Sequence, residues 1–258
     1  MPTRTHEEFT LRTADDPDVA RAMRALVART WPRYLAAAGP ADPMTQGAYF
    51  LDTLCARWPA LQFVLEDEHG EAVVSCNWAP MAHSGNTATL PAEGWDWAIA
   101  HASRCQDAGL APTHGCALAI TIAPEHQGRG LAYVALKHMR QLASDMGLRA
   151  LYAPVRPNHK ERFPTLPIGK YIEMRRPDGL LQDPWMRVHE RLGAHIVGAC
   201  ERSMCLGGRP DEWADWCDAD LSTSGPHVLP RMLSPLEVDL DADWAVYVEP
   251  NVWMVHPL

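Results

Sequence analysis

The hydrophobic positions along the chain follow two periods, which together predict a mixed α/β fold. Residues 9–13 alternate between apolar and polar side chains, which is typical of a strand with one buried face. From Pro17 to about Trp31, apolar side chains recur three and four positions apart, as in an amphipathic helix. The same periods predict strands over 61–65, 72–76, 116–122, 150–155, 195–205 and 244–248. They predict helices over 43–56, 91–107, 131–146, 184–192 and 212–217.

Residues 116–122 are almost continuously apolar, which predicts a central strand that is covered on both faces. The strand ends at Ala123 and Pro124, and a strongly amphipathic helix follows, with Gly147 as its stop. A short glycine-containing segment, 125–130, therefore joins the most buried strand to the most regular helix of the chain.

Three regions interrupt the regular order of strands and helices. Residues 80–113 form an insertion, and residues 156–182 are rich in Pro, Arg and Lys without a clear period. Such a long irregular stretch inside a compact domain is usually functional or mobile. We therefore predict a core over residues 1–206, with these two insertions. Residues 207–258 are predicted to form a C-terminal extension that packs on the core.

Composition narrows the class of protein. The chain has 258 residues, 47% of them hydrophobic, and a net charge of −9, which argues against non-specific binding to DNA or anionic membranes. No run reaches the roughly 18 apolar residues of a membrane span, and no secretory leader begins the chain. The seven Cys contain no CxxC pair and the 12 His show no metal-ligand spacing, so we expect a reduced, cytoplasmic protein without a metal.

The segment after the central strand has the chemistry of an anion site. Glycines at 128 and 130 let the backbone approach a ligand closely, and the start of a helix exposes unpaired N–H groups with a partial positive charge. Together these features suit a phosphate, and Arg129 adds a charge at the mouth. The alternative is an ordinary glycine-rich turn that leads into a helix. The spacing matches neither GxGxxG nor the P-loop.

Two motifs carry a family resemblance. Gln127-x-x-Gly130-x-Ala132 resembles the pyrophosphate-binding signature [RQ]xxGx[GA] of the GNAT N-acetyltransferase superfamily. Residues 187–194, which end in Leu-Gly-Ala, resemble the helix that ends in Leu-Gly before the next strand of that family. The order of elements over residues 7–206 also agrees. The resemblance implies a mixed, mostly antiparallel central sheet flanked by helices.

The resemblance also implies a site for acetyl-CoA or another acyl-CoA as co-substrate. Its pyrophosphate would be held by the backbone of six residues: Gln127, Gly128, Arg129, Gly130, Leu131 and Ala132. Near Ile120 and Ile122 the central strand would separate from strand 151–155, and the pantetheine arm would lie in that gap.

The chain departs from the family at two catalytic positions. Where many members carry a tyrosine that protonates the leaving thiolate, this chain has His189, whose ordinary pKa suits proton donation. The alternative is a histidine that only packs on its helix. Many members also have a carboxylate base on the central strand, whereas residues 117–122 offer only Thr121. The base must therefore lie elsewhere, be water, or be unnecessary.

Acceptor recognition is expected from the regions outside the minimal family core. Residues 156–182 combine basic side chains with aromatic ones, among them Tyr171, and suit an anionic acceptor, the CoA 3′-phosphate, an acyl-carrier protein or tRNA. The net charge makes nucleic acid the least favoured of these, and a solvated charged loop is the alternative. Asp96, Glu249 and Asn251 are further candidates to hold an acceptor amine, although each could equally serve the backbone.

The function that the sequence favours is an N-acyltransferase. It would move an acetyl or other short acyl group from CoA to a primary amine of a small molecule by direct attack. Two alternatives stay open: the same fold with a donor bound to a carrier protein or tRNA, and a protein that binds acyl-CoA without turning it over.

Overall fold

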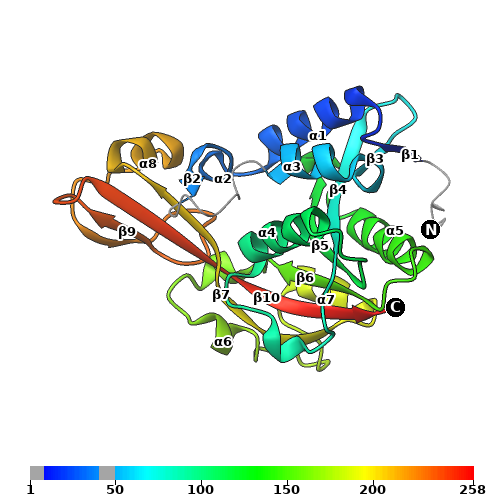
Figure 1. Ribbon diagram of the computed structural model, residues 1–258. Coiled ribbons are helices and arrows are strands. Elements are labelled where there is room, and N and C mark those ends of the chain that lie inside the picture. Colours follow the sequence, from blue (N-terminus) through cyan, green and yellow to red (C-terminus); the bar gives the residue numbers. More distant parts are fainter. Residues whose placement is uncertain (1–8, 41–49) are drawn as a thin grey trace.

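The computed structural model describes residues 9–40 and 50–258, and its centre is one twisted sheet (Figure 1). The strands run in the order β1-β3-β4-β5-β6-β10-β7-β2, and β9 pairs with the outer part of β10. Every pairing is antiparallel except that of β5 with β6. The strands are β1 (Thr10–Thr13), β2 (Gly39–Pro40), β3 (Phe63–Glu66), β4 (Ala72–Met81), β5 (His114–Ile122), β6 (Ala150–Val155), β7 (His195–Gly208), β8 (Gly225–His227), β9 (Leu236–Asp239) and β10 (Trp244–Pro257).

Helices cover both faces of this sheet, which confirms the predicted fold class. One face packs against α1 and α4 through a core that contains Met23 and Ile99, and the other packs against α5 and α7 through Met139 and Met186. The helices are α1 (Pro17–Thr30), α2 (Arg33–Ala37), α3 (Phe50–Arg57), α4 (Gly94–Asp107), α5 (Leu131–Asp145), α6 (Ile168–Tyr171), α7 (Pro184–Arg191) and α8 (Pro210–Cys217). Most expected elements are present, and the first part of the expected helix 43–56 lies outside the described residues.

The C-terminal region is part of the sheet. Strand β10 lies between β6 and β7, and Val252 to Val255 are buried. The apolar run of residues 252–255 explains this position, because a strand covered on both faces needs apolar side chains on both. The core sheet therefore includes β10, which ends at Pro257.

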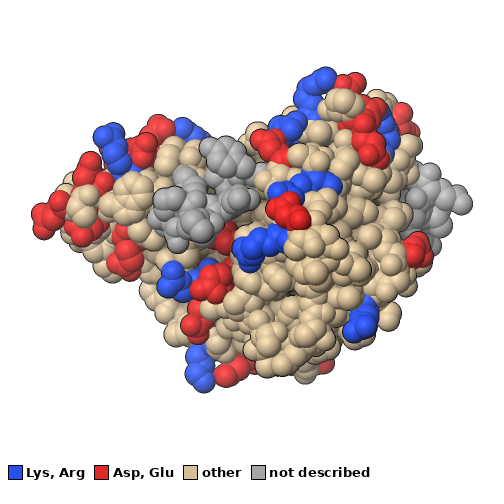
Figure 2. Space-filling model, viewed as in Figure 1, with Lys and Arg blue, Asp and Glu red and all other residues tan. Residues whose placement is uncertain are grey.

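The outer ends of β7 and β10 run together into a second lobe with α2, α8, β8 and β9 (Figure 1), which we call the distal lobe. It has its own apolar cluster around Trp213 and Tyr247. Figure 2 shows acidic side chains gathered over this lobe, whereas much of the face beside it is uncharged. Residues 207–243, expected as a packed extension, thus form an arm that the two long strands carry.

A bulge in β5 shapes the centre of the molecule. Asn77 pairs with Ala119 and Trp78 with Ala117, so Leu118 is an extra residue in β5. An extra residue bends a strand and increases its local twist. The Leu118 carbonyl accepts a hydrogen bond of 2.9 Å from the Trp95 indole, which fixes the bulge to α4.

Strands β5 and β6 separate where this bulge begins. Within the described chain, Gly115–Leu151 and Cys116–Tyr152 are the only pairs that join them. Both strands continue beyond those pairs without pairing to each other. The parallel pair therefore opens into a V at its carboxyl end, where a cavity forms.

Candidate active site

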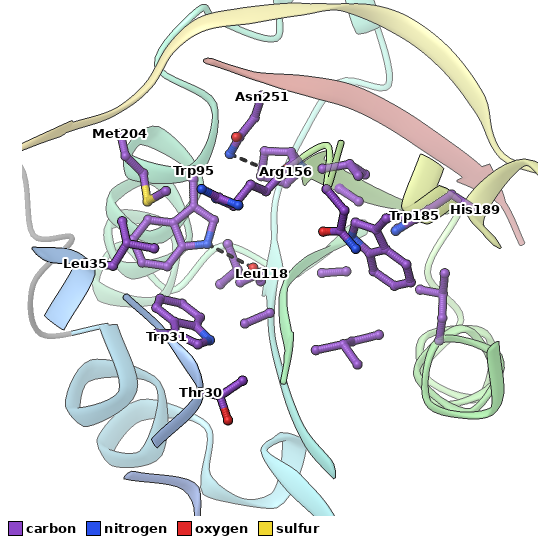
Figure 3. Close-up of a pocket in the computed structure, with 18 of the residues that line it drawn as sticks. Thr30, Trp31, Leu35, Trp95, Leu118, Arg156, Trp185, His189, Met204 and Asn251 are labelled. Carbon is purple, nitrogen blue, oxygen red and sulfur yellow. Dashed lines mark hydrogen bonds between the residues drawn. The ribbon is translucent and has the colours of Figure 1, made fainter. Parts of the chain in front are cut away.

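The cavity between the separated strands has a volume of about 220 Å³, and we call it the sheet cavity. Residues 117–120 of β5 and 153–155 of β6 form its walls. Figure 3 shows Trp31 and Trp95 on one side of it and Trp185 with His189 on the other. The walls are mostly apolar, so a ligand that enters would exchange water for apolar contacts.

A second hollow of about 720 Å³ runs from the sheet cavity to the start of α5, and we call it the loop groove. The two hollows share five lining residues: Thr30, Trp31, Ile120, Asn158 and Trp185. Because these residues border both, the hollows form one continuous groove across the molecule. Its far wall is α7, which contributes Val188 and Arg191.

The glycine loop has the geometry of an anion site. Gly128 and Gly130 have φ angles of 75° and 81°, which L side chains rarely adopt. Gly130 is the N-cap of α5 and offers no side chain to cap it, so the first N–H groups of the helix remain available to a ligand. A Cβ built at either glycine meets no atom within 4 Å. Backbone N–H groups are therefore accessible at this end of the groove.

Seven of the eight residues expected to bind the donor lie together along the loop groove. They are Ile120, Ile122, Gln127, Gly128, Gly130, Leu131 and Ala132. The eighth, Arg129, is exposed and its guanidinium contacts His126 at 2.8 Å, outside the groove lining. Gln127 donates to the Ile122 carbonyl at 3.2 Å, which ties the loop to the end of β5.

His189 lines the sheet cavity from α7 and is 2% exposed. Its Nδ1 lies 2.9 Å from Nε2 of His256 on β10, so one ring donates to the other. Nε2 of His189 and Nδ1 of His256 have no hydrogen-bond partner among the described residues. Burial, with a smaller contribution from His256, holds the pKa of His189 well below its usual value. His189 is therefore a neutral imidazole with one nitrogen free to exchange a proton.

Asn251 lies at the deep end of the sheet cavity and is 1% exposed. Its amide nitrogen donates to the Ser203 hydroxyl at 2.8 Å and to the Pro154 carbonyl at 3.3 Å. Ser203 lies in a stretch of β7 where three residues face one residue of β10. The Asn251 side-chain oxygen has no partner among the described residues, so it can accept a hydrogen bond from a ligand.

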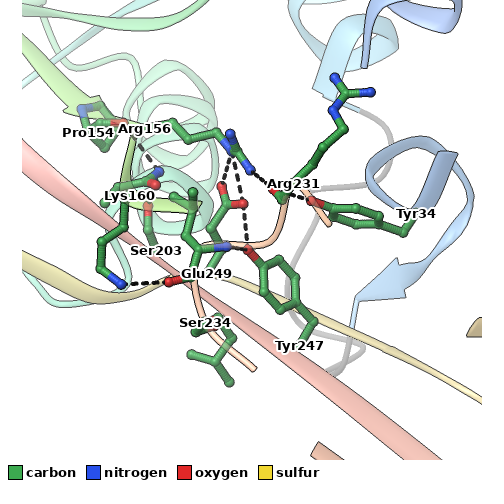
Figure 4. A network of polar contacts seen from close by, with 12 residues as sticks. Tyr34, Pro154, Arg156, Lys160, Ser203, Arg231, Ser234, Tyr247 and Glu249 are labelled. Carbon is green, nitrogen blue, oxygen red and sulfur yellow. Dashed lines mark hydrogen bonds and ion pairs between the residues drawn. The ribbon is translucent and has the colours of Figure 1, made fainter. Parts of the chain in front are cut away.

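Glu249 is fully buried beside the cavity and forms an ion pair with Arg156, which does line it (Figure 4). Arg156 Nε lies 3.0 and 2.9 Å from the two carboxylate oxygens, and Tyr247 donates to the same carboxylate at 2.8 Å. Arg156 Nη2 donates to the Arg231 carbonyl at 2.7 Å. The distal lobe thereby fixes one guanidinium at the edge of the cavity.

Three of the four expected acceptor residues lie outside the cavity lining: Glu249, Asp96 and Tyr171. Asp96 accepts a hydrogen bond from the Cys205 backbone at 3.1 Å, and burial raises the pKa of its carboxyl to about 7. Tyr171 donates at 2.9 Å to Asp183, which caps α7. Both contacts connect segments of the fold to one another.

Sequence reasoning did not single out several residues that border the cavity. Trp31, Trp95 and Arg231 come from three distant segments, and only the fold brings them together. His256, which contacts His189, gave a weak signal as a polar residue directly after the apolar run 252–255. In the described residues no cluster of His, Cys, Asp and Glu is arranged to bind a metal ion. None of the described helices is long and apolar enough to cross a membrane.

Comparison with known proteins identifies the class as an acyl-transferring enzyme. The model of the Acetyltransferase (GNAT) family matches residues 31–162, about half of the chain. The chain is also 35% identical over 215 residues to the arginine N-acetyltransferase avaD of Aspergillus versicolor, which covers 75% of this chain and 73% of the relative. The chain belongs to the GNAT family and is an acetyltransferase.

Solved structures agree with this fold. The loading GNATL domain of CurA from Lyngbya majuscula is 18% identical, with 96% of this chain and 97% of that domain covered and a TM-score of 0.63. The GphF GNAT-like decarboxylase in complex with isobutyryl-CoA is 19% identical, with 96% and 98% covered and a TM-score of 0.59. At these identities the similarity concerns the fold.

Proposed function

We propose that the protein transfers an acetyl group from acetyl-CoA to the primary amine of a small molecule, and that the acceptor is a free amino acid such as arginine. The observation that carries the proposal is the continuous groove, which leads from the glycine loop to the point where β5 and β6 separate. The relative from Aspergillus versicolor is an arginine N-acetyltransferase, which supports the choice of an amino acid as the acceptor.

The donor end would be held by backbone groups. The N–H groups at the start of α5 suit the pyrophosphate, because the helix N-terminus carries a partial positive charge and Gly130 leaves it uncovered. Bound there, acetyl-CoA would supply an activated thioester. The loop groove leads from the loop to the sheet cavity, and the backbone of residues 117–120 would orient the thioester carbonyl between the strands.

We assign His189 as the proton donor to the leaving thiolate. When His189 Nδ1 donates to His256 Nε2, His189 Nε2 is a proton acceptor with no partner among the described residues. The amine nitrogen attacks the carbonyl carbon and gives one proton to Nε2, the carbon–sulfur bond breaks, and the sulfur takes that proton from the transient imidazolium. The proton of the amine thus ends on the thiol and His189 returns to its neutral form, because an imidazolium is a strong enough acid to protonate a thiolate.

No carboxylate lines the sheet cavity among the described residues. The acceptor would therefore enter as a neutral amine, after losing its ammonium proton to water. Arg156 and Arg231 at the cavity favour this, because nearby positive charges and apolar walls lower the pKa of an ammonium group.

The test measures thiol release and identifies the product by mass spectrometry. Purified protein is titrated with acetyl-CoA by calorimetry and then assayed with a panel of amino acids and amines. We expect acetyl-CoA to bind and an N-acetylated amino acid to form. Binding without thiol release would favour a protein that binds acyl-CoA without turning it over, and no binding would favour a carrier-bound donor.

A further inference from the structure

We propose that the acceptor carries a carboxylate, and that Arg156 and Arg231 bind it at the edge of the sheet cavity. This inference rests on the proposed function and adds the residues that select its acceptor. The geometry assigns the two arginines as acceptor-binding residues, although neither belongs to the loop or strand motifs that hold the donor.

The charge that borders the cavity is the first observation. Arg156 and Arg231 are the only side chains in its described lining that are ionised at neutral pH, since burial keeps His189 neutral. The other polar lining groups are Thr30, Asn158 and Asn251. A cavity whose ionised groups are both cations attracts an anionic group on its ligand.

The available donor atoms are the second observation. Nε of Arg156 donates to Glu249, and Nη2 of Arg156 donates to the Arg231 carbonyl. The third nitrogen, Nη1 of Arg156, makes no hydrogen bond to any described residue. The guanidinium cannot rotate away, because Tyr247 and Arg156 hold the fully buried Glu249 between them. Arg156 thus presents a fixed N–H edge, the geometry that guanidinium groups use for carboxylates.

The charge balance is the third observation. Glu249 neutralises Arg156, whereas Arg231 forms no ion pair with any described carboxylate and donates only to the Thr30 carbonyl, at 3.0 Å. With one acceptor carboxylate bound, this edge would hold two positive groups, Arg156 and Arg231, and two negative groups, Glu249 and the carboxylate (Figure 4). A dicationic amine without a carboxylate would instead add charge of the same sign as Arg231.

Arginine and agmatine give a matched test, because they differ only by the carboxylate. We would measure kcat/KM for this pair and for phenylalanine with phenethylamine. In the unaltered protein, kcat/KM for the amino acid of each reacting pair should exceed that for its amine by at least about tenfold. A tenfold ratio corresponds to 1.4 kcal/mol of differential binding.

Two variants test the role of the arginines in acceptor binding separately from their role in the fold. Arg231→Gln alters an exposed side chain and should remove most of the preference, mainly by raising KM for the amino acid. Arg156→Gln alone would leave Glu249 buried without its partner. The double variant Arg156→Gln/Glu249→Gln removes both charges and should also lose the preference. Arg33→Gln, an exposed arginine paired with Asp215 in the distal lobe, is the matched control.

Equal use of the amino acid and its amine by the unaltered protein would overturn the carboxylate assignment and leave the proposed function standing. So would a preference that survives Arg231→Gln and the double variant in folded protein. If the protein binds acetyl-CoA but acetylates no member of either pair, the proposed amino-acid acceptor fails, and this inference fails with it.

Discussion

The two ends of the groove are built in different ways. At the loop groove, five residues between positions 127 and 132 contribute the candidate donor site mainly through their backbone. At the sheet cavity, the side chains come from four separate segments: Trp31 from the C-cap of α1, Trp95 from α4, Arg156 from the segment after β6, and Asn251 from β10. A site made of backbone at one turn can be recognised in a sequence, whereas one assembled from distant side chains requires the fold.

The largest effect should come from His189, which lines the sheet cavity. His189→Gln should lower kcat by about 100-fold or more at pH 7, the range of a lost general acid, because Gln cannot protonate the thiolate. Acetyl-CoA affinity should stay unchanged. Stopped-flow thiol detection and calorimetry measure the two quantities separately.

The control is His138→Gln, on α5 against Phe63. It should leave kcat unchanged. If His189→Gln and His138→Gln both keep kcat within threefold of the unaltered protein, His189 only packs on its helix.

The donor end can be tested with two glycines of the same helix. Gly130→Val should weaken acetyl-CoA binding by at least about tenfold, because a β-branched side chain is strained at a φ of 81° and covers the N–H groups. Gly147, at the other end of α5, has a φ of 71° and equally open surroundings.

Gly147→Val should therefore lose similar stability, roughly 1–2 kcal/mol, and keep its affinity for acetyl-CoA. Calorimetry and chemical denaturation of both variants provide the comparison. Equal loss of affinity in both would mean that strain, and not contact with the loop, explains the effect.

The histidine pair should make the stability depend on pH. Burial lowers the pKa of His256 to about 4, so between pH 4 and 6.5 the unfolded chain binds more protons than the folded one. Stability should then fall on acidification from pH 6.5 to 5, by about 1–2 kcal/mol for each of the two buried histidines. Asp96, whose raised pKa acts in the opposite direction, stabilises the fold at low pH and loses that contribution as the pH rises through about 7.

The difference between the unaltered protein and His189→Gln/His256→Gln isolates the contribution of the pair, because Asp96 is common to both. Urea denaturation at pH 5 and 6.5 measures it. The same change in stability in both proteins would show that the pair is not held neutral.

The smallest effect is expected outside the cavity. Tyr171→Phe removes one hydrogen bond to Asp183 and should cost roughly 1 kcal/mol of stability. It should leave KM for the acceptor within twofold, because Tyr171 does not line the cavity. A large increase in that KM would place Tyr171 in the acceptor site after all.

Much of the fold could be predicted because its elements are locally consistent. The apolar run of β5, the start of α1 at Pro17 and the Gly147 stop of α5 each agree with their structure. The central place of β10 could not be predicted, because it depends on long-range pairing with β6 and β7. Arg231 was missed for the same reason, since the distal lobe carries it to the cavity.

The most direct test of the account is a crossed measurement of both substrates. Acetyl-CoA and arginine KM values are determined for the unaltered protein, Gly130→Val and Arg231→Gln, each at a saturating concentration of the other substrate. We expect Gly130→Val to raise KM for acetyl-CoA alone and Arg231→Gln to raise KM for arginine alone. If Arg231→Gln raised the acetyl-CoA KM and left that of arginine unchanged, the division of the groove into a donor end and an acceptor end would be contradicted.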